Sequence, residues 1–479
     1  MKNTAALILA LITLFSSGTA ACSDADTSKI AGNEFSVSEK ADKSENKKPQ
    51  KEETNNMIKT VKAEYPADPP YPTEEDMFDK KGNYDSDKWC MMNEEWQKAR
   101  SVREEAAASV GTKPFGFYKS MSDELLSDNK QNRVISPVSA YMALAMLAET
   151  TGGSSREQIL DLLGSDDIAD LRKTANGLWR SSYRDDGTVT TLIADSLWLD
   201  DDFAYKKDAV DTLAKSYYAS TFSGDMASPE MTKALRDWIN EQTGGFLEDQ
   251  VNQTGFSAET VMALCSTLYF RGKWNFSKDL TAERVFHGAN GDETVDFMND
   301  TGYDLTYYYS DDYGAVELPF ENGTSMWFIL PDEDKTVDEV LDSGEYLDMT
   351  AASGWKNKKQ LRINYSVPKF DISSDIQLRD QLIDLGVKDV FSDSLADFTP
   401  MTDEKGLFVG EVKQAARVSI DEEGCTAAAF TLGVLCGAAL PPEQEEIDFV
   451  LDRPFVFVIS SDAGQPLFIG TIYDIKGET

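Results

Sequence analysis

Apolar residues recur along the chain with two different periods, which predicts a protein that mixes helices with long strands. Helical spacing is clear in residues 139–149 and 155–163, where Ile159, Leu162 and Leu163 share one face and Gly164 closes the helix. Apolar runs predict strands at residues 190–199, 261–270, 326–330, 361–365 and 449–459. Helices and strands do not alternate regularly, which favours an α+β fold with large mixed sheets.

The first 21 residues have the three parts of a secretory signal. Lys2 precedes an apolar run over residues 5–15, and small residues then lead to Cys22. The run is too short for a permanent membrane span. Its ending, Thr19-Ala20-Ala21-Cys22, resembles a bacterial lipoprotein signal, in which Cys22 is acylated and becomes the mature N-terminus. Simple cleavage is the alternative, so we expect a secreted protein, extracellular or lipid-anchored at the cell surface.

Composition divides the remaining chain into three parts. Residues 22–70 are rich in charged and small polar residues without periodicity, which predicts a disordered charged tether. A flexible chain of this length spans roughly 40 Å, enough to hold a domain clear of a surface. Residues 71–99 form a transition segment, and residues 100–479 have the texture of one globular domain without repeats.

Charge and histidine content exclude several classes of function. The chain has 46 Lys and Arg against 84 Asp and Glu, a formal net charge of -38, so a nucleic-acid partner is not expected. His287 is the sole histidine and no C-x-x-C occurs, so multi-histidine and zinc-knuckle sites cannot be built. We interpret His287 and Cys265 as structural residues. Phosphate-loop, dinucleotide and nucleophile-elbow motifs are also missing, so we expect no metal, no cofactor and no enzyme.

One stretch near the C-terminus is unusually poor in charge. From Cys425 to Leu440 sixteen residues carry no charge, whereas 27% of the whole chain is charged. The stretch exceeds the usual strand length and contains two glycines. Its first half has side chains small enough to slide into a sheet, and Gly424 gives the backbone freedom to turn there. These residues fit a segment that lies outside a sheet and later enters it.

Several motifs, in order along the chain, resemble those of the serpin family and together cover roughly residues 100–475. The matching segments are Asn132-Arg133-Val134-Ile135-Ser136-Pro137-Val138-Ser139, Leu268-Tyr269-Phe270-Arg271-Gly272-Lys273-Trp274-Asn275-Phe276, Val316-Glu317-Leu318-Pro319-Phe320, Val367-Pro368-Lys369-Phe370, Arg453-Pro454-Phe455-Val456-Phe457 and Pro466-Leu467-Phe468-Ile469-Gly470.

The resemblance implies a serpin fold with three β-sheets, a large mixed central sheet, about nine helices and an exposed reactive-centre loop over residues 422–442. It implies a monomeric suicide inhibitor of serine, or alternatively cysteine, proteases. The protease cuts the loop, forms an acyl-enzyme and is distorted as the cut loop inserts into the main sheet. Such an inhibitor has no catalytic residue of its own. The alternative is a non-inhibitory serpin that acts as a binding protein or as a protease substrate.

The resemblance also assigns the parts of the loop. The hinge consists of Glu422, Glu423, Gly424, Cys425, Thr426, Ala427, Ala428 and Ala429. Phe430 stands where the family has a small residue, which would slow insertion. The family's spacing places the reactive bond between Ala438 and Ala439, with Cys436 and Gly437 as alternatives. A small residue before the cut suits an elastase-like protease, whereas a cut after Leu435 or Leu440 would suit a chymotrypsin- or subtilisin-like one.

A hydrogen-bond cluster beneath the centre of the main sheet is implied as well. Its members are Asn132, Ser136, Pro137, Ser139, Ser266 and Gln414, and Trp274 is expected at the top of the sheet. Gln414 stands where members commonly have His, and Ser266 where many have Asn. Both side chains can donate and accept, so a satisfied network remains possible. Without that His, however, the cluster loses the obvious group that would titrate near neutral pH.

Overall fold

The computed structural model describes residues 5–15, 58–66, 68–73, 75–79, 82–187, 190–244, 251, 254–274, 280–320, 323–351, 355–422 and 445–476. Its α-helices are α1 (Ser86–Val110), α2 (Phe115–Leu126), α3 (Pro137–Thr150), α4 (Gly153–Leu162), α5 (Ile168–Ser182), α6 (Lys207–Ser216), α7 (Pro229–Gln242), α9 (Val337–Ser343), α10 (Glu345–Thr350) and α11 (Arg379–Asp384). Short 3-10 turns are η1 (Glu75–Met77) and η3 (Asp389–Phe391).

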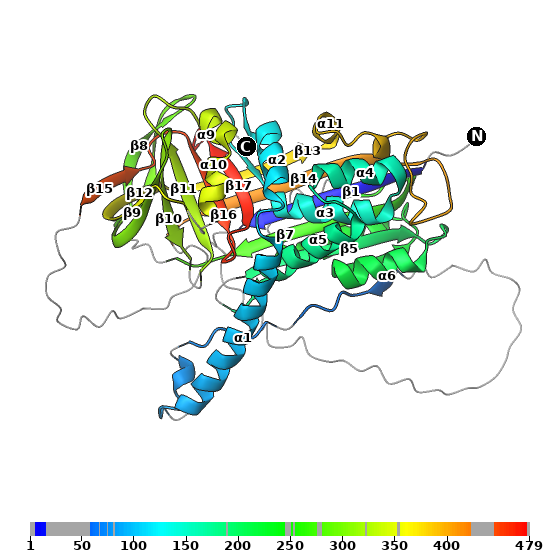
Figure 1. Cartoon of the computed structure of the whole chain (residues 1–479), viewed down its shortest axis with the longest axis horizontal. Helices are drawn as coiled ribbons and strands as arrows, with labels where there is room; N and C mark the ends of the chain where they lie inside the picture. The colour runs from blue at the N-terminus through cyan, green and yellow to red at the C-terminus, as the bar shows by residue number, and fades with distance from the viewer. Residues whose placement is uncertain are drawn as a thin grey trace, which may run out of the picture.

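The main sheet has eight strands in the order β13-β14-β1-β7-β5-β6-β2, with β4 paired to β5. Their bounds are β13 (Phe370–Gln377), β14 (Leu407–Ile420), β1 (Ala5–Phe15), β7 (Thr260–Arg271), β5 (Thr190–Asp200), β6 (Ala219–Gly224), β2 (Lys59–Val61) and β4 (Arg184–Asp185). Helices α3, α5 and α6 cover one face of this sheet (Figure 1). On the other face, Trp238 and Ile239 of α7 pack against Trp198 and Phe222. Because both faces are covered, β5 and β7 are buried almost throughout.

The second set of strands has the order β15-β12-β9-β10-β11-β16-β17-β3, with β8 paired to β9. Their bounds are β15 (Glu446–Val450), β12 (Lys358–Pro368), β9 (Gly291–Tyr309), β10 (Tyr313–Pro319), β11 (Ser325–Pro331), β16 (Phe455–Ser460), β17 (Pro466–Ile472), β3 (Arg133–Ile135) and β8 (Ala282–Gly288). The long strand β9 pairs with β12 along most of its length and with β10 at its end, so it joins two sheets. The expected α+β architecture of three sheets is therefore confirmed.

The elements predicted from periodicity are confirmed except one strand. Residues 139–149 and 155–163 lie in α3 and α4, and Gly164 follows α4 with a φ of 64°, in the left-handed region. Residues 449–459, however, form parts of two strands, β15 and β16. Pro454 between them has no N–H to donate to a ladder, and Arg453 turns to donate to the carbonyl of Pro331 at 2.9 Å.

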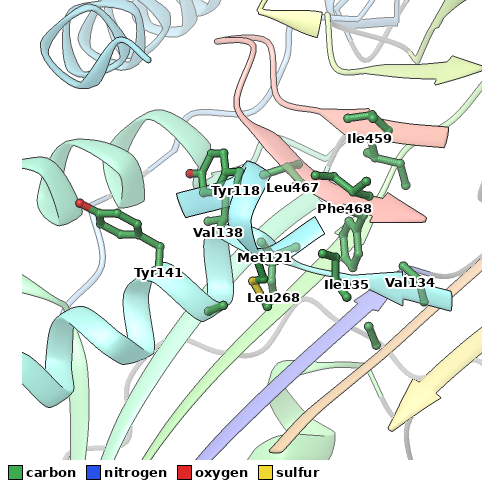
Figure 2. Close-up of a cluster of buried hydrophobic side chains, with 14 of the residues drawn as sticks. Tyr118, Met121, Val134, Ile135, Val138, Tyr141, Leu268, Ile459, Leu467 and Phe468 are labelled. Atoms are coloured by element: carbon green, nitrogen blue, oxygen red, sulfur yellow. The ribbon is translucent and has the colours of Figure 1, made fainter. Parts of the chain in front are cut away.

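A buried core fixes the start of α3 against the main sheet. Figure 2 shows side chains from α2, α3, β3, β7, β16 and β17 meeting there. The labelled members are at most 4% exposed: Tyr118, Met121, Val134, Ile135, Val138, Tyr141, Leu268, Ile459, Leu467 and Phe468. Since Leu268 belongs to β7 and Val138 to α3, this packing sets where α3 lies beneath the sheet.

The C-terminal part of the predicted tether lies against the body. We call residues 58–66 and 68–71 the N-terminal strap. Within it, β2 runs antiparallel to β6, and the Ala63 N–H donates to the Ser220 hydroxyl at 3.0 Å. The ring of Tyr65 lies 5.4 Å from that of Trp179 on α5. The prediction of a disordered tether was therefore wrong for residues 58–70, because the polar composition concealed the anchoring role of Tyr65. Residues 22–57 lie outside the described residues.

Ion pairs connect the strap with helix α1 and with the turn between β16 and β17. Arg103 of α1 and Asp68 of the strap are 2.7 Å apart, and both side chains are 6% exposed. Arg103 and Arg184 lie 3.9 and 3.6 Å from Asp462, and Arg184 also contacts Asp186 at 2.8 Å. Helix α1 begins at Ser86, so the predicted boundary at residue 100 falls inside a continuous helix.

Asp68→Ala should lower the free energy of unfolding by about 3 kcal/mol, because it leaves the buried Arg103 without its nearest carboxylate. The measurement is the midpoint of urea-induced unfolding at pH 7. Lys62→Ala is the matched control, since Lys62 and Glu241 form an exposed pair at 4.0 Å and its loss should leave the midpoint unchanged. Equal midpoints for Asp68→Ala and the unmodified chain would contradict the structural role of the strap.

Candidate functional site

The centre of the main sheet holds a strand position between β7 and β14. These two strands run in the same direction, and β1 lies between them, parallel to both. Ten residue pairs join β1 to β14, from Ala5 with Leu407 to Leu14 with Arg417. Residues 5–15 thus fill this position in the uncleaved chain, and their cleavage as part of a signal remains a prediction. We call the boundary between β7 and β14 the seam.

The uncharged stretch begins where β14 ends. Strand β14 runs to Ile420, and Asp421 and Glu422 follow it directly. A segment that turned back at Gly424 would run antiparallel to β14 within the seam, in the opposite direction to β1. Parallel and antiparallel neighbours both supply complete hydrogen-bond ladders, so one seam can accept either direction.

Asp421 and Glu422, which precede the stretch, make three contacts that anchor the end of β14. The Lys369 ammonium and the Thr281 hydroxyl both lie 2.7 Å from a Glu422 carboxylate oxygen. The Trp274 indole N–H donates to the carbonyl of Asp421 at 2.7 Å. Trp274 is itself fixed, because its ring stacks on Phe320 with centroids 4.9 Å apart. The structure therefore brings Trp274 and Glu422, two of the predicted site residues, to the same end of the sheet.

These contacts change the acidity of the hinge carboxylate. Partial burial raises the pKa of Glu422, but hydrogen bonds from Lys369 and Thr281 outweigh it, so the pKa lies below its usual range. A lowered pKa means that the carboxylate stabilises the fold above its unfolded-state pKa of about 4.3. This contribution is lost as the pH falls through the folded-state pKa.

The central cluster lies beneath the seam and joins the sheet to α3. Ser136 caps α3 by accepting from the Ser139 N–H at 3.3 Å, and Pro137 occupies the first turn, where its missing N–H costs nothing. The Ser139 hydroxyl donates to Ser266 of β7 at 3.4 Å. Gln414 of β14 donates to the carbonyl of Ser136 at 2.9 Å, while its own side-chain oxygen has no partner. Side chains from both sides of the seam therefore reach the start of α3.

Asn132 does not belong to this cluster, so that part of the prediction was wrong. Its side-chain oxygen accepts from the N–H groups of Tyr473 and Asp474, at 2.7 and 3.1 Å. Its side-chain nitrogen donates to the carbonyl of Asp474 at 2.6 Å. Asn132 precedes β3, which pairs with β17, so it fixes the C-terminal segment instead of the main sheet.

One buried carboxyl beside this cluster, that of Asp195, was not predicted from the sequence. It lies in the middle of β5, directly opposite Ser266 of β7, and is fully buried. Burial raises its pKa to about 7, while the nearby Ser266 hydroxyl lowers it somewhat. A charged residue inside an otherwise uncharged run of β-branched, apolar and hydroxyl residues was the signal that could have revealed it.

The remaining predicted site residues fall outside this arrangement. Residues 423–444, with the hinge from Glu423 to Ala429 and the bond between Ala438 and Ala439, lie outside the described residues, as does Cys22. Beyond the loop, Glu445 and Glu446 lie 3.3 and 3.1 Å from Lys359 and Arg362 of β12.

The other singled-out groups are structural. Cys265 is 1% exposed in the core, and burial raises the pKa of its thiol. His287 is the last residue but one of β8, and its ring lies 2.7 Å from Asp292. Within the described ranges, no group of three His, Cys, Asp or Glu residues is placed to hold a metal ion. No described helix is long and apolar enough to cross a membrane.

Comparison with known proteins identifies the family to which this arrangement belongs. Residues 114–475 match the family model described as serpin, serine protease inhibitor. The chain belongs to the serpin family. The description of the family is that of protease inhibitors, not of enzymes.

Similar proteins come from distant organisms. An uncharacterized serpin-like protein of Thermococcus kodakarensis is 29% identical over 380 residues, which are 77% of this chain and 85% of that protein. The leukocyte elastase inhibitor of Sus scrofa is 29% identical over 354 residues, 71% of this chain and 92% of that protein. The crystal structure of tengpin, a thermophilic serpin, in its native state superposes with a TM-score of 0.66 at 28% identity, covering 76% of this chain and 93% of tengpin.

The anchor at Glu422 can be tested with a double-mutant cycle of Lys369→Met and Glu422→Gln. We expect a coupling energy of about 1 kcal/mol at pH 7, because each variant removes the same partly exposed ion pair. The coupling should shrink as the pH is lowered through the folded-state pKa of Glu422, because the carboxyl then becomes protonated. Unfolding in urea over a series of pH values provides the measurement. Additive effects at pH 7 would contradict a role for this pair in anchoring the hinge.

Proposed function

We propose that this serpin is a suicide inhibitor that traps serine proteases with a preference for small residues, of the elastase type. The protease attacks the reactive-centre loop, forms an acyl-enzyme, and is held covalently when the cut loop enters the seam. The observation that supports this most strongly is the strand position between β7 and β14, next to the anchored start of the loop at Glu422.

Once residues 5–15 have left it as part of the signal, the seam offers the energy that such a mechanism needs. A strand that enters it gains backbone hydrogen bonds on both sides, and its alternate side chains become buried. Neither gain is available to the loop while both its ends are joined to the body, at β14 and β15. Cleavage frees one end, so insertion becomes possible only after the protease has bound covalently.

The residues of the loop support the choice of target. Ala438 precedes the proposed bond, and a methyl side chain fits a shallow specificity pocket. The chain also carries no Arg or Lys between Glu422 and Glu446, which a trypsin-like protease would require. One relative is named leukocyte elastase inhibitor, which agrees with this specificity class.

A non-inhibitory role remains the second candidate, because two residues oppose fast insertion. Phe430 would have to enter the sheet among small side chains. The unpartnered side-chain oxygen of Gln414 lies at the seam, and a buried acceptor without a donor weakens the packing there. Slow insertion would give the protease time to hydrolyse the acyl-enzyme, and the serpin would then act as a substrate.

Incubation of the purified protein with an elastase should give an adduct that survives denaturing electrophoresis. Intact mass should find a released C-terminal fragment that begins at Ala439. A cut loop with fully active protease, and no adduct with any elastase-type protease, would favour the substrate role.

Ala427→Arg provides the matched variant, because its large charged side chain cannot be buried in the seam without a partner. We expect the variant to be cut at the same bond while the protease keeps its activity. Phe430→Ala should have the opposite effect and raise the fraction of cleavage events that end in an adduct. Trapping by Ala427→Arg as efficient as by the unmodified chain would contradict insertion into the sheet.

We further propose that Cys22 is acylated and anchors the inhibitor to the cell surface. Its support is the signal-like sequence before Cys22, and several acyl chains on one residue hold a protein firmly to a bilayer. Cys22→Ser should move the protein from the membrane fraction to the medium, as measured by immunoblot. Cys90→Ser is the control, and release of both variants, or of neither, would contradict the anchor.

A further inference from the structure

Asp195 occupies a position one strand away from the seam. It pairs with Ser266 in the ladder between β5 and β7, and the other edge of β7 forms the seam. Ser266 in turn contacts the Ser139 hydroxyl of α3 at 3.4 Å. A short row of side chains therefore runs from Asp195 of β5 through Ser266 of β7 to Ser139 of α3. The sheet must move on this helix to admit a strand.

The carboxyl of Asp195 is 0% exposed and has no charged partner among the described groups. Neither of its oxygens makes a hydrogen bond of ordinary geometry, and the Ser266 hydroxyl is the donor near enough to lower its pKa. Its environment is supplied by Ser266 and Cys265 of β7, Ala219 of β6, Ser139 of α3 and, farther away, Tyr65 of the strap. Among the described groups, no Lys or Arg contributes to its ionisation.

The two protonation states of this carboxyl have very different costs. As a neutral acid it can share a hydrogen bond with the Ser266 hydroxyl and remain buried. As a carboxylate it is a charge in an apolar interior without a cation, which is among the most unfavourable arrangements in a folded protein. The cost is relieved only if the surrounding packing loosens enough to admit water.

We propose that Asp195 is an acid-stabilised brake on strand entry: its neutral form keeps β5 and β7 packed on α3, and its ionised form loosens this packing so that the seam opens. The effect on packing follows from the burial of Asp195 between β5 and β7 and does not depend on the proposed function. The effect on inhibition rests on the proposed function.

The direction of the pH dependence follows from the raised pKa. The unfolded chain releases this proton near pH 3.9, and the folded chain near pH 7. The stability that neutral Asp195 supplies is therefore fully present below pH 3.9 and is lost as the pH rises through about 7. This supplies the group titrating near neutral pH that the central cluster lost when Gln414 replaced His.

The first experiment compares urea unfolding of the unmodified chain and Asp195→Asn between pH 5 and pH 8. Other titrating groups are common to both, so they cancel in the difference. The ratio of folded to unfolded protein should fall over this range by roughly a hundredfold more in the unmodified chain. Asp161→Asn, an exposed carboxyl on α4, is the control and should follow the unmodified chain. Parallel profiles for the unmodified chain and Asp195→Asn would overturn the proposal.

A second variant covers the case in which Asp195→Asn does not fold. Ser266→Ala keeps the titrating group but removes the hydroxyl that lowers its pKa, so the fall in stability should move to higher pH. Infrared difference spectra should also show the protonated-carboxyl C=O band of Asp195 at pH 5 and its loss by pH 8. A band that is absent at pH 5, or a profile that Ser266→Ala leaves in place, would contradict the assignment.

The consequence for inhibition is measured separately. The fraction of loop cleavages that end in an elastase adduct should rise between pH 5 and pH 8 in the unmodified chain and stay level in Asp195→Asn. Since unfolding and infrared spectra need no protease, they test the brake even if the chain traps no elastase. If the unfolding and infrared results agree with the proposal but no adduct forms, the proposed function alone is refuted. Equal pH dependence of trapping in both proteins would refute the link between Asp195 and strand entry.

Discussion

The hydrogen-bonding requirement of the edges of β7 and β14 is the constraint on which the rest of this structure depends. Each edge presents a row of backbone donors and acceptors that must be paired, because a backbone polar group shielded from water without a partner costs free energy. The two strands run in the same direction, so a third strand can lie between them and pair with both. The pairing within this sheet therefore depends on which strand occupies the position between β7 and β14.

Two groups of side chains around the seam are placed to affect the entry of a strand. Glu422, Lys369 and Trp274 hold the start of the loop at the end of the sheet. Ser136, Ser139, Ser266 and Gln414 tie β7 and β14 to the start of α3. In the proposed mechanism, the first group holds the start of the loop in place and the second keeps β7 and β14 packed on α3. Asp195 belongs to the second group but is the member whose charge changes near neutral pH.

Much of this arrangement could be predicted from the sequence, and the failures have physical reasons. Runs rich in apolar residues predicted β5, β7 and β11, because strands covered on both faces bury most of their side chains. Asn132 was assigned to the cluster by resemblance, but its side chain satisfies the backbone of the C-terminal segment. The strap was missed because a few contacts, chiefly those of Tyr65 and Asp68, outweigh a polar composition. Long-range pairs of this kind leave no periodic signal in a single sequence.

The position of β16 and β17 has a consequence for the order in which the molecule can form. These strands come from the end of the chain, yet they lie between β11 and β3 in the second set of strands, and their side chains complete the core around α2 and α3. Asp462, in the turn between them, completes the ion cluster of Arg103 and Arg184. The N-terminal helices therefore have no finished core until the ribosome has made nearly the whole chain, and contacts of such sequence separation form slowly.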